Sequence, residues 1–183
     1  MRIPWNESVG LVVDVQSRLF PYMYDSYATQ ETMKTLIAGL QILELPMLAT
    51  QQYTQGLGET IDPIKNALER GKKFEPIEKT AFSCLDEPSF ATALEETGRR
   101  FVIIAGIEAH VCLLQTSMDL LAAGYVPVVV EDCTSSRKAN DKHVAVERMR
   151  NSGVTVTTSE SILFELCRYS GTDTFKSLSK LVK

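Results

Sequence analysis

The sequence predicts a three-layer α-β-α domain built around a doubly wound, mainly parallel sheet. Short apolar runs rich in β-branched residues recur along the chain, segments with helical spacing separate them, and 183 residues suit one domain of ordinary size. Strands and helices that alternate in this way form a parallel sheet covered by helices on both faces. We therefore expect a single domain over residues 1–183, with no internal repeat.

The predicted elements follow one another along the chain. The apolar runs are typical of strands buried on both faces and occupy residues 9–15, 46–50, 101–105, 126–131 and 154–158. Helical spacing predicts helices over residues 31–43, 63–69, 89–97, 112–123, 141–151 and 160–169. Residues 53–59 and 71–84 lack a clear period, which predicts functional loops that could act as lids.

Composition and charge limit the classes of partner. The 19 Lys and Arg residues against 23 Asp and Glu give a net charge of −4, and no long basic run is present, so nucleic acid is not an expected partner. Residues 1–8 do not resemble a secretory signal, and no apolar segment is long enough to span a bilayer. These features predict a cytoplasmic protein that does not associate with membranes.

Cysteines and histidines give no metal-binding pattern. The four cysteines form no CxxC pair, the two histidines are far apart, and no strand is followed by a GxGxxG or P-loop pattern. We therefore expect neither a metal nor a cofactor. Cys84, Cys133 and Cys167 are interpreted as buried structural thiols, and His110 is assigned a minor role at most.

Cys112 is the first candidate for chemistry, because it follows a short turn after the strand at 101–105 and begins the next predicted helix. Unpaired N–H groups and the helix dipole favour a thiolate at a helix start, and the same donors can hold a developing oxyanion. The alternative is a small buried core residue, the more common fate of a free cysteine.

Two further residues could act with this thiol. Asp14 ends the first predicted strand, where ligands bind in open α/β sheets, and its carboxylate could accept the thiol proton. It could equally be a helix N-cap or an ion-pair partner. Lys79 lies in the aperiodic loop, where an ammonium could orient the carboxylate and favour the thiolate, but alone it could be a solvated surface lysine.

Together these residues resemble the isochorismatase-like cysteine hydrolases, which combine an Asp after the first strand, a loop Lys and a helix-start Cys. The resemblance covers nearly the whole chain and is greatest to the eukaryotic isochorismatase-domain-containing proteins. The segments that carry it are Asp14-Val15-Gln16 with Phe20 downstream, Thr50-Gln51-Gln52-Tyr53, Lys79-Thr80-Ala81-Phe82-Ser83, Gly106-Ile107-Glu108-Ala109-His110-Val111-Cys112, Asp119-Leu120-Leu121 and Met149-Arg150-Asn151-Ser152-Gly153.

The resemblance implies a catalytic triad of Asp14, Lys79 and Cys112 and a thioester intermediate. It also implies an oxyanion hole made by the backbone N–H groups of Ala109 and Cys112, with a cis peptide bond that we expect between Glu108 and Ala109. The presence of the cysteine indicates acyl chemistry, most simply cleavage of an amide C–N bond in a small carbonyl compound.

Residues near strand ends and in loops are the candidate walls of the substrate pocket: Gln16, Phe20, Tyr53, Phe82 and Glu108. Nicotinamidases of this family bind a metal through an Asp-x-His set in the loop after the second strand. This chain has Gln and Tyr there, so the resemblance does not extend to the metal.

Two outcomes stay open for function. The chain could be an active hydrolase, or a catalytically silent member of the family that acts as a binding or regulatory protein. Family members usually assemble, which implies a homo-oligomer, and the amphipathic segment 161–183 is the candidate for contacts between subunits.

Overall fold

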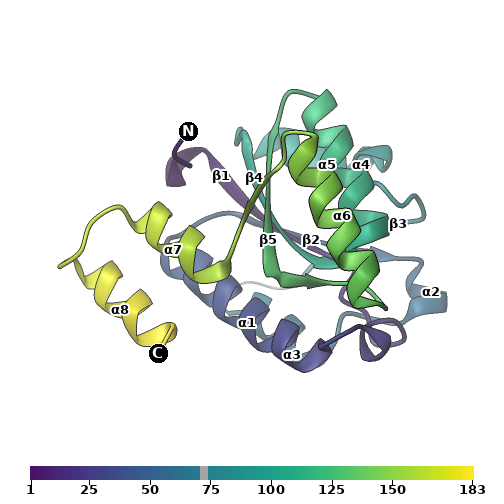
Figure 1. The fold of residues 1–183 in the computed structure, drawn as a ribbon, viewed down its shortest axis with the longest axis horizontal. Helices are drawn as coiled ribbons and strands as arrows, with labels where there is room; N and C mark the ends of the chain where they lie inside the picture. Colours follow the sequence, from purple (N-terminus) through teal and green to yellow (C-terminus); the bar gives the residue numbers. More distant parts are fainter. Residues whose placement is uncertain (71–73) are drawn as a thin grey trace.

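A parallel sheet forms the centre of the computed structural model, which describes residues 1–70 and 74–183. Within these residues the sheet has six strands in the order β3-β2-β1-β4-β5-β6, and every strand pair is parallel (Figure 1). The strands are β1 (Ser8–Val13), β2 (Met47–Gln52), β3 (Ile77–Lys79), β4 (Phe101–Ile107), β5 (Val126–Ser135) and β6 (Thr155–Thr157).

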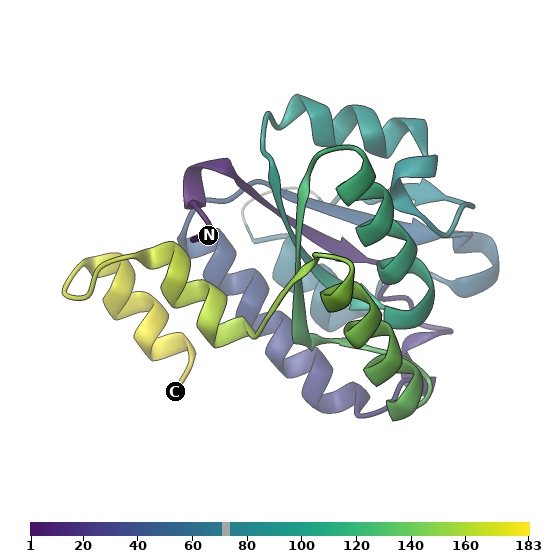
Figure 2. The same ribbon diagram turned by 45° about the horizontal axis from the view of Figure 1, so that its top comes forward.

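Helices cover both faces of this sheet. One layer contains α1 (Ser26–Ile42), α3 (Asp62–Leu68), α7 (Ser159–Cys167) and α8 (Asp173–Leu181). The other contains α4 (Pro88–Glu96), α5 (Leu114–Ala122) and α6 (Ala139–Asn151), and Figure 2 shows α4 and α5 across the sheet from α1. The predicted three-layer α/β fold is therefore confirmed.

Side chains along the buried strands point alternately into two apolar cores, one on each face of the sheet. In β4, Phe101 and Ile103 pack toward α1 and α7, whereas Val102 and Ile104 pack toward α4, α5 and α6. Side chains of successive strand residues point to opposite faces, so strands that are apolar throughout can support a helix layer on each side.

The strand order reverses between β1 and β4. From β1 the chain builds the sheet outward through β2 and β3, and it then returns to add β4, β5 and β6 on the other side of β1. In open parallel sheets, the carboxyl ends of strands at such a switch point form the binding crevice. Asp14 follows β1 and Glu108 follows β4, so both residues lie at this crevice.

A glycine allows the two strands to approach closely at the switch point. A Cβ atom at Gly106 would lie 2.7 Å from the backbone nitrogen of Val13 and 2.9 Å from its carbonyl carbon. Gly106 also has a φ of 130°, a conformation that side chains disfavour, and the register between β4 and β5 shifts beside it. A larger residue would push β1 away from β4.

Some elements differ from the sequence expectations. β3 lies inside the segment 71–84 that was expected to be a loop, because three residues are too few to show a period; residues 71–73 of that segment lie outside the described residues. Likewise, α2 (Thr54–Leu57) occupies the predicted loop 53–59. α1 begins at Ser26, before the predicted residue 31, because its first turn is polar and lacks the apolar spacing.

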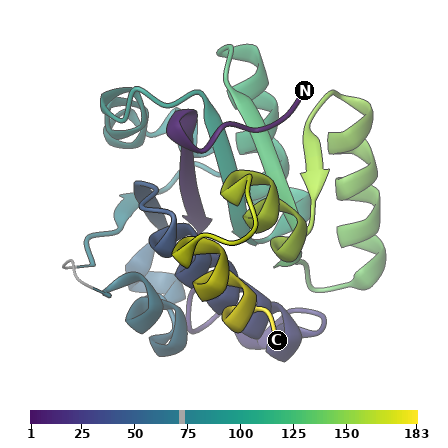
Figure 3. The ribbon, with the colours of Figure 1, turned by 90° about the vertical axis from the view of Figure 1, so that its left-hand side faces the viewer.

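The C-terminal segment forms two helices rather than one. α8 packs against α1 and α7, and its Leu178 is fully buried in the core on that side of the sheet (Figure 3). Part of the apolar face that suggested subunit contacts is therefore used within the chain.

Candidate active site

Three residues predicted to act together lie at the carboxyl edge of the sheet. Asp14 directly follows β1, Lys79 is the last residue of β3, and Cys112 lies in the turn after β4. Lys79 Nζ is 2.6 Å from Asp14 Oδ2, and neither side chain is exposed. Cys112 is 6% exposed, and the charges of Asp14 and Lys79 both act on its thiol. The carboxylate, the ammonium and the thiol thus form one buried electrostatic group.

Asp14 is held by both its backbone and its side chain. Its φ of 52° is left-handed, which Asp tolerates better than most residues, and turns the chain out of β1. Its N–H donates to the carbonyl of Thr50 (3.2 Å), and the Thr50 hydroxyl donates to Oδ1 (2.8 Å). Each carboxylate oxygen thus has its own donor, Thr50 on Oδ1 and Lys79 on Oδ2.

The Lys79 ammonium is fully occupied within the protein. Besides Asp14, it donates to Gln52 Oε1 at 2.6 Å and lies 3.1 Å and 3.2 Å from the carbonyls of Ala81 and Phe82. An ammonium has only three N–H groups, so these acceptors use all of them. Lys79 therefore orients the carboxylate and supplies a compensating charge, with no N–H left for another group.

Gln52 is a member of this site that the sequence did not reveal. Its amide nitrogen donates to the carbonyl of Thr80 at 2.7 Å, so both ends of the side chain are used while it holds Lys79. Gln16, predicted to line the pocket, is buried and bonds to the backbone N–H and carbonyl of Gln52 at 2.7 Å and 2.9 Å. It also donates to the carbonyl of Gly58. Gln16 thus fixes the end of β2.

Cys112 lies in a π-helical turn, Ala109–Leu113, that leads into α5. The helical structure therefore begins at Ala109, three residues before the predicted start at residue 112, and its first turn is wider than that of an α-helix. Burial raises the pKa of the Cys112 thiol well above its usual value, the charge of Asp14 raises it further, and the Lys79 ammonium lowers it only in part. The resting site therefore holds a protonated thiol beside a carboxylate that can accept its proton.

The position expected for the cis peptide bond was wrong by one residue. The cis bond joins Ile107 to Glu108, not Glu108 to Ala109. β4 continues to Ile107, two residues beyond the predicted end of the strand, so the chain turns at the bond that directly follows it. Among the described residues, no acceptor is hydrogen-bonded to the Ala109 N–H. That donor is available, as an oxyanion hole would require.

A second polar cluster borders the turn. Glu108 is 6% exposed, and its Oε2 accepts from Arg137 Nε at 3.1 Å and lies 3.9 Å from His110 Nδ1. The same histidine nitrogen is 3.0 Å from the Ser136 hydroxyl. The cluster links the turn after β4 to the end of β5, and it accounts for His110 without a role as a base.

The predicted aromatic walls have different environments. Phe20 is 4% exposed and packs in the core beside α1. Tyr53 and Phe82 are both about half exposed, and they flank the two strands that carry Gln52 and Lys79. Only these two present an aromatic surface to solvent; a role in substrate binding stays a prediction for all the pocket residues.

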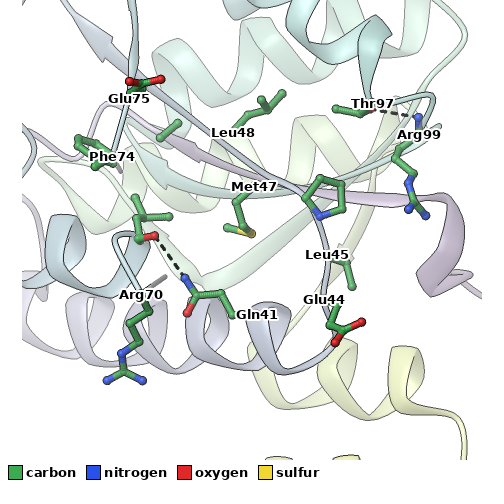
Figure 4. A pocket seen from close by; sticks show the side chains of 13 residues that line it. Gln41, Glu44, Leu45, Met47, Leu48, Arg70, Phe74, Glu75, Thr97 and Arg99 are labelled. Carbon is green, nitrogen blue, oxygen red and sulfur yellow. Dashed lines mark hydrogen bonds between the residues drawn. The ribbon is translucent and has the colours of Figure 1, made fainter. Parts of the chain in front are cut away.

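A cavity of about 690 Å³ lies away from these residues, around the first half of β2 (Figure 4). Its walls include Gln41, Met47, Leu48, Arg70 and Arg99, and the Gln41 side chain donates to the carbonyl of Ala67 in the last turn of α3. Since β2 runs from this cavity toward Gln52, the cavity and the candidate active site lie at opposite ends of the strand.

Neither a metal-binding cluster nor a membrane-spanning helix is found in the described part of the chain. In residues 1–70 and 74–183, no group of three or more His, Cys, Asp and Glu side chains is placed to hold a metal ion. In the same residues, no helix is both long and apolar enough to cross a bilayer. Independence of metals stays a prediction.

The sequence and the fold match known proteins. The sequence matches the Isochorismatase domain family over residues 8–161. It is 35% identical over 181 residues to the secreted isochorismatase effector Isc1 of Phytophthora sojae, covering 97% of this chain and 85% of that protein. It is 32% identical to isochorismatase domain-containing protein 2 of Danio rerio, covering 99% and 89%. The structure of the MAR1 ribonuclease from Caenorhabditis elegans superimposes with a TM-score of 0.91 at 35% identity, covering 100% and 92%.

The protein is thus a three-layer α/β protein with a buried ion pair and a thiol gathered at the switch point of its sheet. Within that class, the chain belongs to the isochorismatase family, and it is similar to the eukaryotic isochorismatase domain-containing proteins.

Proposed function

We propose that the protein is a cysteine hydrolase that cleaves the amide C–N bond of a small molecule through Cys112, Asp14 and Lys79. The observation that carries this proposal is the buried Asp14 carboxylate, which is paired with Lys79 at 2.6 Å and whose charge acts on the buried Cys112 thiol. A thiol with a raised pKa is a weak nucleophile on its own, so it needs an adjacent base.

In the acylation half-reaction, the Cys112 sulfur attacks the carbonyl carbon while its proton passes to Asp14. A C–S bond forms, and the carbonyl π electrons move to the oxygen, which becomes an oxyanion. The C–N bond then breaks as the oxyanion re-forms the carbonyl. The leaving nitrogen takes the proton from Asp14, and an acyl thioester remains on Cys112.

In the deacylation half-reaction, water attacks the thioester and gives one proton to Asp14. The C–S bond breaks, the acid is released, and the thiolate takes the proton back from Asp14. Asp14 is thus the base and then the acid in each half. The charge of Lys79 stays constant throughout, and it favours the carboxylate form that each half-reaction requires.

The turn after β4 supplies the groups for the oxyanion. The free N–H of Ala109, together with that of Cys112, would donate to the negative oxygen in the tetrahedral state. Glu108 begins this turn and is held by Arg137, so the donors sit on a backbone that is fixed before substrate arrives.

A small substrate fits the limited access to the thiol, which is 6% exposed, and the net charge of −4 argues against nucleic acid. The ribonuclease name of the Caenorhabditis elegans protein belongs to that protein. We propose a cytoplasmic location for this chain, although the relative from Phytophthora sojae is described as secreted. We also propose a homo-oligomer. Tyr22 and Tyr27, just before and within the first turn of α1, are highly exposed, and a second subunit would cover them.

Turnover of a panel of small amides and esters, measured for the wild type, Cys112→Ala and Cys112→Ser, tests the proposal. We expect hydrolysis of at least one compound and a loss of at least about 1,000-fold in both variants. A short RNA in the same panel should remain intact. Cys167→Ala, which changes a cysteine outside the site, controls for general effects of removing a thiol.

Equal turnover in the wild type and in Cys112→Ala would overturn the mechanism. A wild type that hydrolyses nothing in the panel, with Cys112 unreactive toward alkylating agents, would favour a binding or regulatory protein instead.

A further inference from the structure

A chain of hydrogen bonds extends behind Asp14, away from Cys112 and Lys79. The Thr50 hydroxyl donates to Asp14 Oδ1 at 2.8 Å, and the Cys84 thiol lies 4.0 Å from the same hydroxyl oxygen, within the longer reach of a sulfur donor. The backbone N–H of Cys84 in turn donates to the Thr116 hydroxyl at 2.9 Å. None of the mechanistic steps above uses Thr50 or Cys84.

The chemistry of these groups fixes the direction of the chain. A carboxylate only accepts hydrogen bonds, so the single proton of the Thr50 hydroxyl must point toward Asp14. The remaining lone pairs of that hydroxyl can then only accept. The Cys84 S–H is the donor placed to satisfy them, and burial keeps it protonated, because it raises the pKa of Cys84 to about 11.

Bulk solvent does not reach these side chains. Asp14 and Cys84 are 0% exposed and Thr50 is 1% exposed. A buried hydroxyl that lost its partner could not exchange it for solvent, so removal of one member leaves another without a partner.

The chain also connects the base to the helix that carries the nucleophile. Thr50 belongs to β2, Cys84 begins the short turn before α4, and Thr116 lies in the first turn of α5, which continues from the turn of Cys112. The chain therefore runs from Asp14 through Thr50 and Cys84 to Thr116, on the helix that follows the turn of Cys112, and each contact joins one element to the next.

We propose that Thr50 is a positioning residue that holds Asp14 as an oriented, ionised base, and that Cys84 keeps the Thr50 hydroxyl turned toward it. With Thr50 on Oδ1 and Lys79 on Oδ2, the carboxylate cannot rotate away from the thiol. A hydrogen bond to the charged form also favours that form. This inference rests on the proposed function, since it assigns Asp14 the role of base.

The test compares Thr50→Val, which keeps the shape but removes the hydroxyl, with Thr50→Ser, which keeps the hydroxyl. We expect kcat to fall about 10- to 100-fold in Thr50→Val with little change in KM, and to recover mostly in Thr50→Ser. The acid limb of the kcat profile should move to higher pH in Thr50→Val only. Cys84→Ala should cost less, and it should cost nothing further when combined with Thr50→Val.

A second measurement does not depend on turnover. Carbon-13 NMR of aspartate-labelled protein, with the Asp14 signal assigned by Asp14→Asn, reports on the hydrogen bonding of this carboxylate at a fixed pH. We expect the Asp14 carboxylate signal to shift in Thr50→Val and to return to its wild-type position in Thr50→Ser.

An unchanged Asp14 carboxylate signal and an unchanged kcat profile in Thr50→Val would overturn the inference. Cys112→Ala, assayed in parallel, separates this result from failure of the proposed function. Full activity without the thiol would disprove the mechanism, whereas a normal Thr50→Val beside an inactive Cys112→Ala would disprove only the role of Thr50.

Discussion

Lys79 and Asp14 form an ion pair that is closed to solvent, with Nζ 2.6 Å from Oδ2 and both side chains 0% exposed. Removing two charges from water is costly, and their attraction offsets that cost only where the remaining N–H groups also find acceptors. Gln52 and two backbone carbonyls provide those acceptors. The pair is therefore stable as a unit, and each partner depends on the other.

Replacement of Lys79 by Met should destabilise the protein strongly, because it leaves the Asp14 carboxylate buried without a compensating charge. We expect the free energy of unfolding, measured by urea denaturation, to fall by about 3–5 kcal/mol. The double variant Lys79→Met with Asp14→Asn removes both charges and should recover part of this loss. A double variant that is less stable than Lys79→Met alone would contradict the ion-pair account.

Asp14→Asn should separate turnover from thiol reactivity. Without a base, hydrolysis should fall at least about 100-fold. Alkylation of Cys112 by iodoacetamide, however, should become faster at pH 8, because the charge of Asp14 is among the causes that raise the pKa of this thiol. The rates are measured by mass spectrometry of the Cys112 peptide, with folding checked by circular dichroism. Slower alkylation in the variant would contradict this prediction, because it would mean that the charge of Asp14 does not keep the thiol protonated.

The positions of Asp14 and Cys112 could be predicted from the sequence, because each follows a strand that its apolar residues make recognisable. Lys79 was singled out through the family resemblance, since the β3 that carries it has only three residues. Thr50 and Gln52 were not predicted to be part of the site. Their partners are 36 and 27 residues away, and only the parallel register of β1, β2 and β3 brings them together.

Gln52→Leu should destabilise the site, because Gln52 accepts a hydrogen bond from the Lys79 ammonium. The substitution removes the acceptor 2.6 Å from Nζ and leaves the carbonyl of Thr80 without its donor. We expect a loss of about 1–3 kcal/mol in unfolding free energy, together with a lower kcat. Gln55→Leu is a matched control, because Gln55 is exposed in the neighbouring α2. Equal stability of the two variants would mean that Lys79 does not need the Gln52 amide.

Stability should decrease in alkaline solution because of Cys84. The folded state raises the pKa of Cys84 to about 11, so between the ordinary thiol value near 8.5 and pH 11 the unfolded chain loses a proton that the folded chain retains. Ionisation then favours the unfolded state, and the stabilisation present below pH 8 is lost progressively. This one group should cost about 1–2 kcal/mol by pH 10. Urea denaturation at pH 8 and pH 10 measures the loss, which should be smaller in Cys84→Ser; an identical loss in that variant would assign it to other groups.

During turnover the Cys112 sulfur should carry the acyl group, and rapid-quench mass spectrometry measures this directly. Wild-type protein is mixed with an amide or ester that it hydrolyses, quenched in acid during the first turnover, and digested. We predict that the peptide containing Cys112 gains the mass of the acyl group, that hydroxylamine removes it, and that Cys112→Ala shows no such adduct. An acyl group on a different residue, or steady product formation with no adduct at any time, would contradict the account.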